Sequence, residues 1–309
     1  MSLAWAHGLL KPSFIPEAPQ RDLREWVRYR THLIDERTRE VNRVHQVLEN
    51  ANLKLSSVAT DVMGVCGRDR LAALIAGQSD PATLAQLAKG KLRPKIAQLE
   101  RALTGRVNDS HRLLLRLHLE HMDALNAKIT TLEQKIDYRL PPFDQADRLT
   151  RLQTIPGVGP KVAQVILAEV GSTVTRCPSA AHLASWAGLV PGQNESAGRN
   201  RSPKTNPANR YLKARLVEAA LAASHTRDNY LSAQCRRLAA RRGKKRAAVA
   251  VAHSILVIAF HISAKGTVFF DLAANYFDRR KADAVQLQLV KRLQRLGLKV
   301  TLEPLSATA

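Results

Sequence analysis

The stretch Ile155-Pro156-Gly157-Val158-Gly159-Pro160-Lys161 lies between a short helical segment that ends near Thr154 and a helical run from Lys161 to Val170. Its order of apolar, proline, glycine, apolar, glycine and basic residues is typical of the turn in a helix-hairpin-helix unit. The two glycines permit backbone conformations that a Cβ atom resists, and they let phosphate oxygens approach the backbone. The next helix begins with exposed N–H groups and a partial positive charge, to which Lys161 adds a full charge. This turn is therefore expected to hold a nucleic-acid backbone without reading its sequence.

The alternative is an ordinary turn between two helices, in which glycine is also common. The charge balance of the chain favours the first interpretation. The 309 residues include 48 Lys+Arg against 26 Asp+Glu, which gives a formal net charge of +22 and a pI near 10.6. A charge of this size concentrates polyanions around a protein and speeds their association.

Much of this charge lies in one segment. Between Arg199 and Arg246 there are fourteen Lys and Arg residues, opposed only by Glu218 and Asp228, so the segment carries +12. A solvent-exposed face usually mixes both signs, which favours nucleic acid as the partner. The residues expected to contact DNA are Gly157, Val158, Gly159, Lys161, Arg199, Arg201, Lys204, Arg210, Arg215, Lys244 and Lys245.

Membranes are the other polyanion to consider. No apolar run approaches the roughly 20 residues that a membrane-spanning helix needs, and the best candidate, Ala247 to Ile262, is interrupted by His253 and Ser254. The N-terminus lacks the pattern of a signal peptide. The three cysteines lie far apart and form neither a disulfide framework nor a zinc pattern. We therefore expect a cytoplasmic protein.

Hydrophobic periodicity predicts a mainly α fold. Apolar residues recur at three- and four-residue steps from Arg21 to Ala51, which indicates one long helix. A second long helix is expected from Ser110 to Ile136, and its last apolar residues are spaced as in a coiled-coil seam. Short helices punctuated by glycines lie between them. We expect a long helical, coiled-coil-like arm whose two helices pack as an antiparallel hairpin or pair with another subunit.

The Pro141-Pro142 pair marks a linker to a second helical domain that contains the helix-hairpin-helix. After the hairpin we expect a helix at Ala180–Ala187, an irregular loop from Gly188 to Pro207, and helices at Asn209–Ser224 and Ala247–Ser263. The only strand patterns are weak ones at 267–270 and 299–302. The expected organisation is a lead-in over 1–20, the arm over 21–137, the linker over 138–147, the second domain over 148–304 and a disordered tail over 305–309.

The loop from Gly188 to Pro207 places reactive groups on an irregular backbone. Glu195 could act as a base or metal ligand, Ser196 as a nucleophile, and Arg199 and Arg201 as phosphate clamps. The alternative is a solvent-exposed loop that caps a helix, and the residues alone favour this alternative over catalysis.

The order of motifs along the chain is more specific than any one of them. It comprises Gly8-Leu9-Leu10-Lys11-Pro12-Ser13-Phe14-Ile15-Pro16, the turn at 155–159, Leu183-Ala184-Ser185-Trp186-Ala187-Gly188-Leu189-Val190-Pro191, Asn194-Glu195-Ser196-Ala197-Gly198 and Asn209-Arg210-Tyr211-Leu212. This succession closely resembles bacterial insertion-sequence transposases of the 110/1111 type, the DEDD transposases, and covers nearly the whole chain.

The resemblance implies a DNA transposition protein with DNA and a guide RNA as partners. The family joins a RuvC-like domain, whose four acidic residues bind divalent metal, to a helical arm and a serine-bearing C-terminal domain. It implies Mg²⁺ as the cofactor of the complete protein and a serine nucleophile that attacks a DNA phosphodiester. The motif places this nucleophile on Ser196, supported by Glu195. We expect a homo-oligomer that assembles through the arm.

The chain departs from the family at its N-terminus. The family's acidic residues precede the segment that here begins at Gly8, so we expect no complete metal site in this chain and doubtful activity on its own. Acidic residues of the arm such as Asp35 and Glu40 are scattered on helical patterns and are expected at the surface. His118 and His121 share a helix face but lack an evident set of partners for a metal site, so a packing or surface role is expected for them.

Three functions remain open. The first is a transposase whose acidic half is supplied elsewhere, and the second is a catalytically inactive DNA-binding remnant. The third is a helix-hairpin-helix module from DNA repair, against which the match at Asn194 to Gly198 argues.

Overall fold

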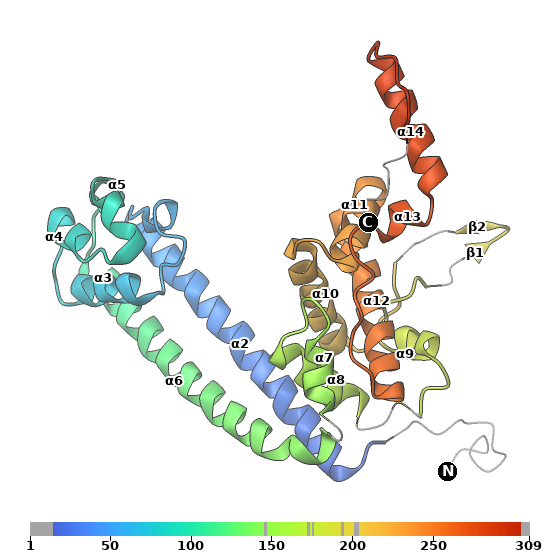
Figure 1. Cartoon of the computed structure of the whole chain (residues 1–309). Coiled ribbons are helices and arrows are strands. Elements are labelled where there is room, and N and C mark those ends of the chain that lie inside the picture. The colour runs from blue at the N-terminus through green and yellow to red at the C-terminus, as the bar shows by residue number, and fades with distance from the viewer. Residues whose placement is uncertain are drawn as a thin grey trace. The chain divides into compact units, whose positions relative to one another are not determined.

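The computed structural model describes residues 15–144, 147–171, 174, 176–192, 195–200 and 204–303. The protein is mainly helical, as the hydrophobic periodicity predicts (Figure 1). The one sheet in these ranges has two short antiparallel strands, β1 (Glu195–Ser196) and β2 (Arg199–Asn200). The chain divides into two compact units, Glu25–Arg139 and a second unit made of Met1–Arg24 with Leu140–Ala309.

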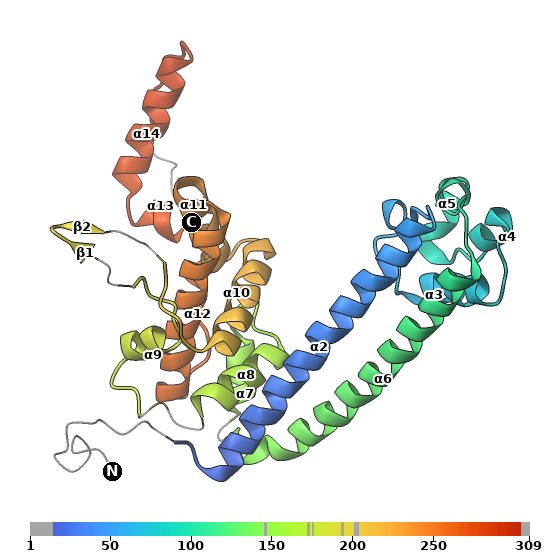
Figure 2. The same ribbon diagram turned by 180° about the vertical axis from the view of Figure 1, so that it is seen from behind.

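Two long helices dominate the unit Glu25–Arg139. They are α2 (Ala18–Asn50), whose first residues belong to the other unit, and α6 (Asp109–Arg139). They run side by side in both views (Figures 1 and 2), and Leu33 of α2 packs with Leu125 and Ile129 of α6. Residues nearer the end of α2 contact residues nearer the start of α6. Within this chain the two helices therefore form an antiparallel hairpin.

Shorter helices pack at the end of this hairpin where α2 ends and α6 begins. They are α3 (Val65–Ile75), α4 (Pro81–Gln86) and α5 (Ile96–Ala102), with 3-10 turns at Leu55–Ser57 and Gly90–Lys95. Their apolar side chains form one buried cluster with the end of α2 and the start of α6. The cluster supplies the long-range contacts that two isolated helices would lack.

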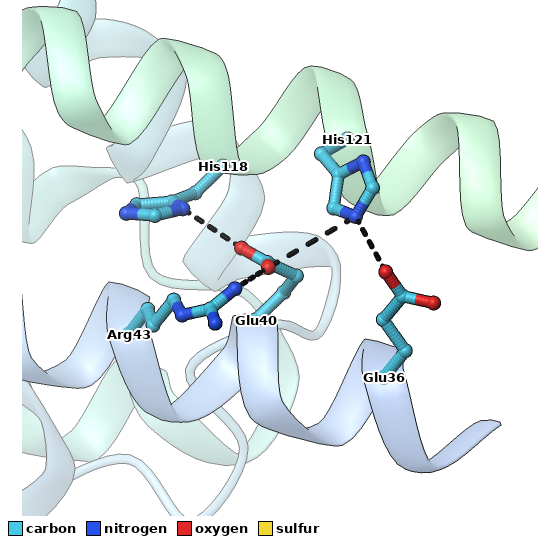
Figure 3. Close-up of polar contacts among 5 residues, drawn as sticks. All are labelled: Glu36, Glu40, Arg43, His118 and His121. Atoms are coloured by element: carbon cyan, nitrogen blue, oxygen red, sulfur yellow. Dashed lines mark hydrogen bonds and ion pairs between the residues drawn. The ribbon is translucent and has the colours of Figure 1, made fainter. Parts of the chain in front are cut away.

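A polar cluster joins α2 to α6 near this end (Figure 3). His118 Nδ1 lies 2.8 Å from Glu40 Oε2, His121 Nε2 lies 3.3 Å from Glu36 Oε1, and Arg43 pairs with Glu40. The Glu40 side chain is only 3% exposed, so the expectation that it lies at the surface is wrong. Its buried charge needs these partners. The carboxylate partners of both histidines come from the other helix, so the sequence around the histidines does not reveal them. Among the described residues no group of three or more His, Cys, Asp or Glu could hold a metal ion.

The second unit is built around α12 (Lys244–Lys265). It packs against α7 (Arg148–Gln153), α9 (Ala180–Trp186), α10 (Arg210–His225) and α11 (Tyr230–Arg242), while α8 (Pro160–Val170) packs on α7 and α10. By length and composition α12 could cross a membrane, and it is longer than the predicted helix. Its apolar residues Val251, Ile255 and Leu256 are buried against neighbouring helices, as in the core helix of a globular unit.

Several elements differ from the prediction. The basic stretch before α12 is the helix α11, and two further helices follow α12, namely α13 (Tyr276–Arg279) and α14 (Ala282–Arg295). The strand patterns at 267–270 and 299–302 are wrong, because both segments are irregular. α6 extends to Arg139, so the predicted linker begins with helical residues. Most of the lead-in and the tail lie outside the described residues.

Candidate nucleic-acid interface

Residues 154–159 form the turn between α7 and α8. Gly157 has φ +84°, and a Cβ atom there would lie 2.1 Å from the Ala219 carbonyl oxygen of α10. Glycine is therefore required here because the turn packs tightly on α10. This requirement holds whether or not a ligand approaches the turn. The Val158 side chain is buried, so a contact from this residue to DNA would have to come from its backbone.

Gly159 has a different environment. It is the N-cap of α8 in an extended conformation, and no atom lies within 4 Å of a Cβ built on it. Pro160 is the first residue of α8, and Lys161 beside it is exposed. The helix therefore begins at an open surface, where its partial positive charge attracts anions.

A groove of about 800 Å³ lies at the N-terminus of α12. Its lining combines four cationic side chains with small and apolar ones: Leu189, Pro191, Lys204, Thr205, Arg242, Lys245, Arg246, Val249 and Ala250. No carboxylate belongs to this lining within the described parts of the chain. The bridge between Pro191 and Thr205, with the Gly192 N–H donating to the Lys204 carbonyl oxygen at 2.8 Å, holds the two ends of the loop together. We call this site the α12 groove.

The charge at the start of α12 is unfavourable for the helix itself. Its first three residues are Lys244, Lys245 and Arg246, its first turn contains no acidic residue, and its N-cap is Gly243. A helix N-terminus carries roughly +0.5 of an elementary charge, so each cation there costs about 0.3–1 kcal/mol at an exposed site. A bound phosphate would reverse this effect, since it would accept hydrogen bonds from the N–H groups at the helix start and neutralise the cationic side chains.

The other cations expected at DNA are less concentrated. Arg210 is exposed at the start of α10, where its Nη2 donates to the Tyr211 hydroxyl at 2.9 Å. Arg215 is 19% exposed and pairs with Glu218 at 2.6 Å, so part of its charge is already compensated. Lys244 is exposed but does not line the α12 groove.

The β1–β2 hairpin holds the predicted catalytic residues. Glu195 and Ser196 are exposed on β1, where Ser196 lies opposite the exposed Arg199 of β2. Arg201 lies outside the described residues. Active sites shift the pKa values of their groups by burying them in a pocket. The Glu195 and Ser196 side chains are exposed to solvent instead.

Sequence reasoning missed two cations of the groove. Arg242 and Arg246 belong to the basic run that the charge count identified, but the sequence indicates only a connection there and not the junction of two helices. Only the helical geometry shows which of its side chains line a groove together with Lys204.

Two family models match the chain. Residues 149–236 match the transposase IS116/IS110/IS902 family, and residues 2–53 match a DEDD transposase model of the IS110 type. A search of curated proteins found no match. The first matched segment spans the turn at Gly157, the β1–β2 hairpin and α10.

These matches correct one expectation. Catalysis in the DEDD family rests on acidic residues, so the assignment of Ser196 as a nucleophile supported by Glu195 is wrong. The assignment came from the family resemblance and not from the loop residues, which by themselves favour a solvent-exposed loop. DEDD transposases are typically metal-dependent, but the described residues show no group fit to bind the metal, and we derive no chemical step through it.

Membership in a transposase family implies that the chain binds DNA. The two matched segments lie in different parts of the chain and point to the same group of proteins. The chain therefore belongs to the IS110-type transposase family, whose members are the DNA transposition enzymes of insertion sequences.

Proposed function

We propose that the unit around α12 is the part of this transposase that holds the DNA backbone. The observation that supports this proposal is the α12 groove, where Lys204, Arg242, Lys245 and Arg246 line one concave surface. The open N-terminus of α8 at Gly159 is a second candidate contact. Both would act through charge and backbone N–H groups, so they position DNA without selecting a sequence.

The contribution of the groove can be measured through salt dependence. The variant Lys245→Gln/Arg246→Gln removes two groove cations, and Lys291→Gln/Arg292→Gln removes two exposed cations from α14 as a control. With unrelated duplexes of about 20 base pairs, the slope of log affinity against log salt should fall by about 0.9 for each phosphate that the variant no longer neutralises. An equal change in the two variants would show that only net charge matters, and the proposal would be wrong.

The same chemistry extends to a guide RNA, because a cationic groove accepts the phosphates of either nucleic acid. We include guide RNA as a proposed second partner. The proposed setting is the cytoplasm, where Cys66, Cys177 and Cys235, which form no disulfide in the structure, would stay reduced.

We also propose that the arm joins copies of the chain. Leu113, Leu114 and Leu117 of α6 are 52%, 42% and 50% exposed, although α6 packs on α2 through its other residues. Neighbouring exposed leucines on a helix mark a contact surface. By light scattering after gel filtration, Leu113→Gln/Leu117→Gln should shift the protein toward monomer, and an unchanged mass would contradict an arm-mediated oligomer.

A further inference from the structure

A second basic cavity lies between α11 and α13, outside the α12 groove. It measures about 320 Å³, and α11 contributes Gln234, Arg237, Leu238 and Arg241 while the α13 region contributes Phe277, Arg280 and Lys281. Four of these seven lining residues are cations and none is acidic. All four cations are exposed. Within the described ranges none of them forms an ion pair. The cavity is thus a concentration of uncompensated positive charge, which we call the α11–α13 pocket.

The aromatic ring of this pocket already contacts other side chains. Phe277 stacks on Tyr230 with ring centroids 5.2 Å apart and an interplanar angle of 21°, and it meets the edge of Tyr276. The Arg237 guanidinium carbon lies 5.2 Å from the centroid of the same ring. This cation–π contact holds Arg237 in position before any ligand arrives. A ligand would therefore be recognised by its charge, since the ring is not free to stack on a base.

The end of α11 links this pocket to the α12 groove. Arg241 lines the pocket and Arg242 lines the groove. Successive residues of a helix point about 100° apart, and their Cα atoms are separated by about 3.8 Å. The two sites therefore open on neighbouring faces of the corner where α11 ends and α12 begins. One chain of phosphates that passes round this corner could contact both.

We propose that the α11–α13 pocket is a second phosphate-binding site, which takes a phosphodiester of a nucleic-acid strand that leaves the α12 groove. A cavity of about 320 Å³ admits a phosphate with its sugar but not a duplex. The inference rests on the proposed function of the α12 groove, and it adds a path for one strand beyond that groove.

The test compares four variants of the full chain in binding to a single strand of about 24 nucleotides, made as DNA and as RNA of the same sequence. Arg280→Gln/Lys281→Gln alters the pocket, Lys245→Gln/Arg246→Gln alters the groove, and Lys291→Gln/Arg292→Gln on α14 is the charge-matched control. The pocket variant should bind about tenfold more weakly, and its salt slope should fall by about 0.7 for each phosphate that it no longer neutralises. Arg241→Gln, on the other helix, should act in the same direction, which excludes a local distortion of α13.

Each outcome decides between the two proposals. A pocket variant that behaves like the control overturns the second site, while the groove variant still reports on the proposed function. A groove variant that also behaves like the control overturns the proposed function itself. Weaker binding of both DNA and RNA, or of one of them, supports the site. The comparison of DNA with RNA identifies which strand occupies it.

Discussion

Arg24 and Glu169 form an ion pair in which Arg24 Nε lies 3.4 Å from Glu169 Oε2, and the Glu169 side chain is fully buried. Asn209 Nδ2 donates to the same oxygen at 2.6 Å, and Arg24 Nη2 donates to the Glu169 carbonyl oxygen at 2.8 Å. The Asn209 side chain also caps α10, because its Oδ1 accepts from the Leu212 N–H. One buried carboxylate thus joins the start of α2, the end of α8 and the start of α10.

Removing one partner of this pair should destabilise the protein. We expect Arg24→Ala to lower the free energy of unfolding by about 3 kcal/mol, because it removes the Arg24 cation from a buried carboxylate. Arg21→Ala, an exposed position on the same helix, should change it by no more than about 0.5 kcal/mol. Urea denaturation measures both. Equal midpoints for the two variants would show that the pair contributes nothing.

The two glycines of the α7–α8 turn should respond differently to alanine. Gly157→Ala forces a side chain into a positive-φ position and against the Ala219 carbonyl, and strain and overpacking together should cost about 3 kcal/mol. Gly159→Ala meets open space, so it should cost no more than about 1 kcal/mol, the usual effect of alanine at a helix N-cap. Thermal unfolding followed by circular dichroism checks this difference. If both variants melted alike, the packing of the turn on α10 would be unimportant.

A mutation at the start of α12 should separate stability from DNA binding. We expect Lys244→Glu to stabilise the protein by about 0.3–1 kcal/mol, because a carboxylate suits a helix N-terminus. DNA affinity should fall at the same time, since the change reverses a charge beside the α12 groove. Lys265→Glu in the last turn of α12 is the matched control and should destabilise by a similar amount. A destabilised Lys244→Glu would contradict the electrostatic argument.

His253 should make the protein sensitive to acid. Burial lowers the pKa of His253 below its ordinary value of 6.5. The unfolded chain then binds the proton more readily than the folded one, so stability falls as the pH falls through 6.5 toward the folded pKa, and this contribution vanishes above 6.5. His253→Leu should reduce the difference in unfolding free energy between about pH 5 and about pH 7.5. The same pH dependence in both proteins would exclude this role for His253.

The long helices follow from the sequence itself. The predictions over 21–51 and 110–136 correspond to Ala18–Asn50 and Asp109–Arg139, and the helix from Lys161 corresponds to Pro160–Val170. They succeed because apolar periodicity is a local property of the chain. The basic segment and the family resemblance were likewise readable from residue order. α11 was missed because its repeated arginines leave few apolar residues from which a period can be read.

Only the tertiary structure decided which distant residues meet. It pairs His118 with Glu40, places Gly157 against α10 and brings Lys204 to Lys245 at the start of α12. It also places Glu195 and Ser196 on an exposed two-stranded hairpin. Such contacts depend on how helices pack, and packing joins side chains that no local pattern relates to one another.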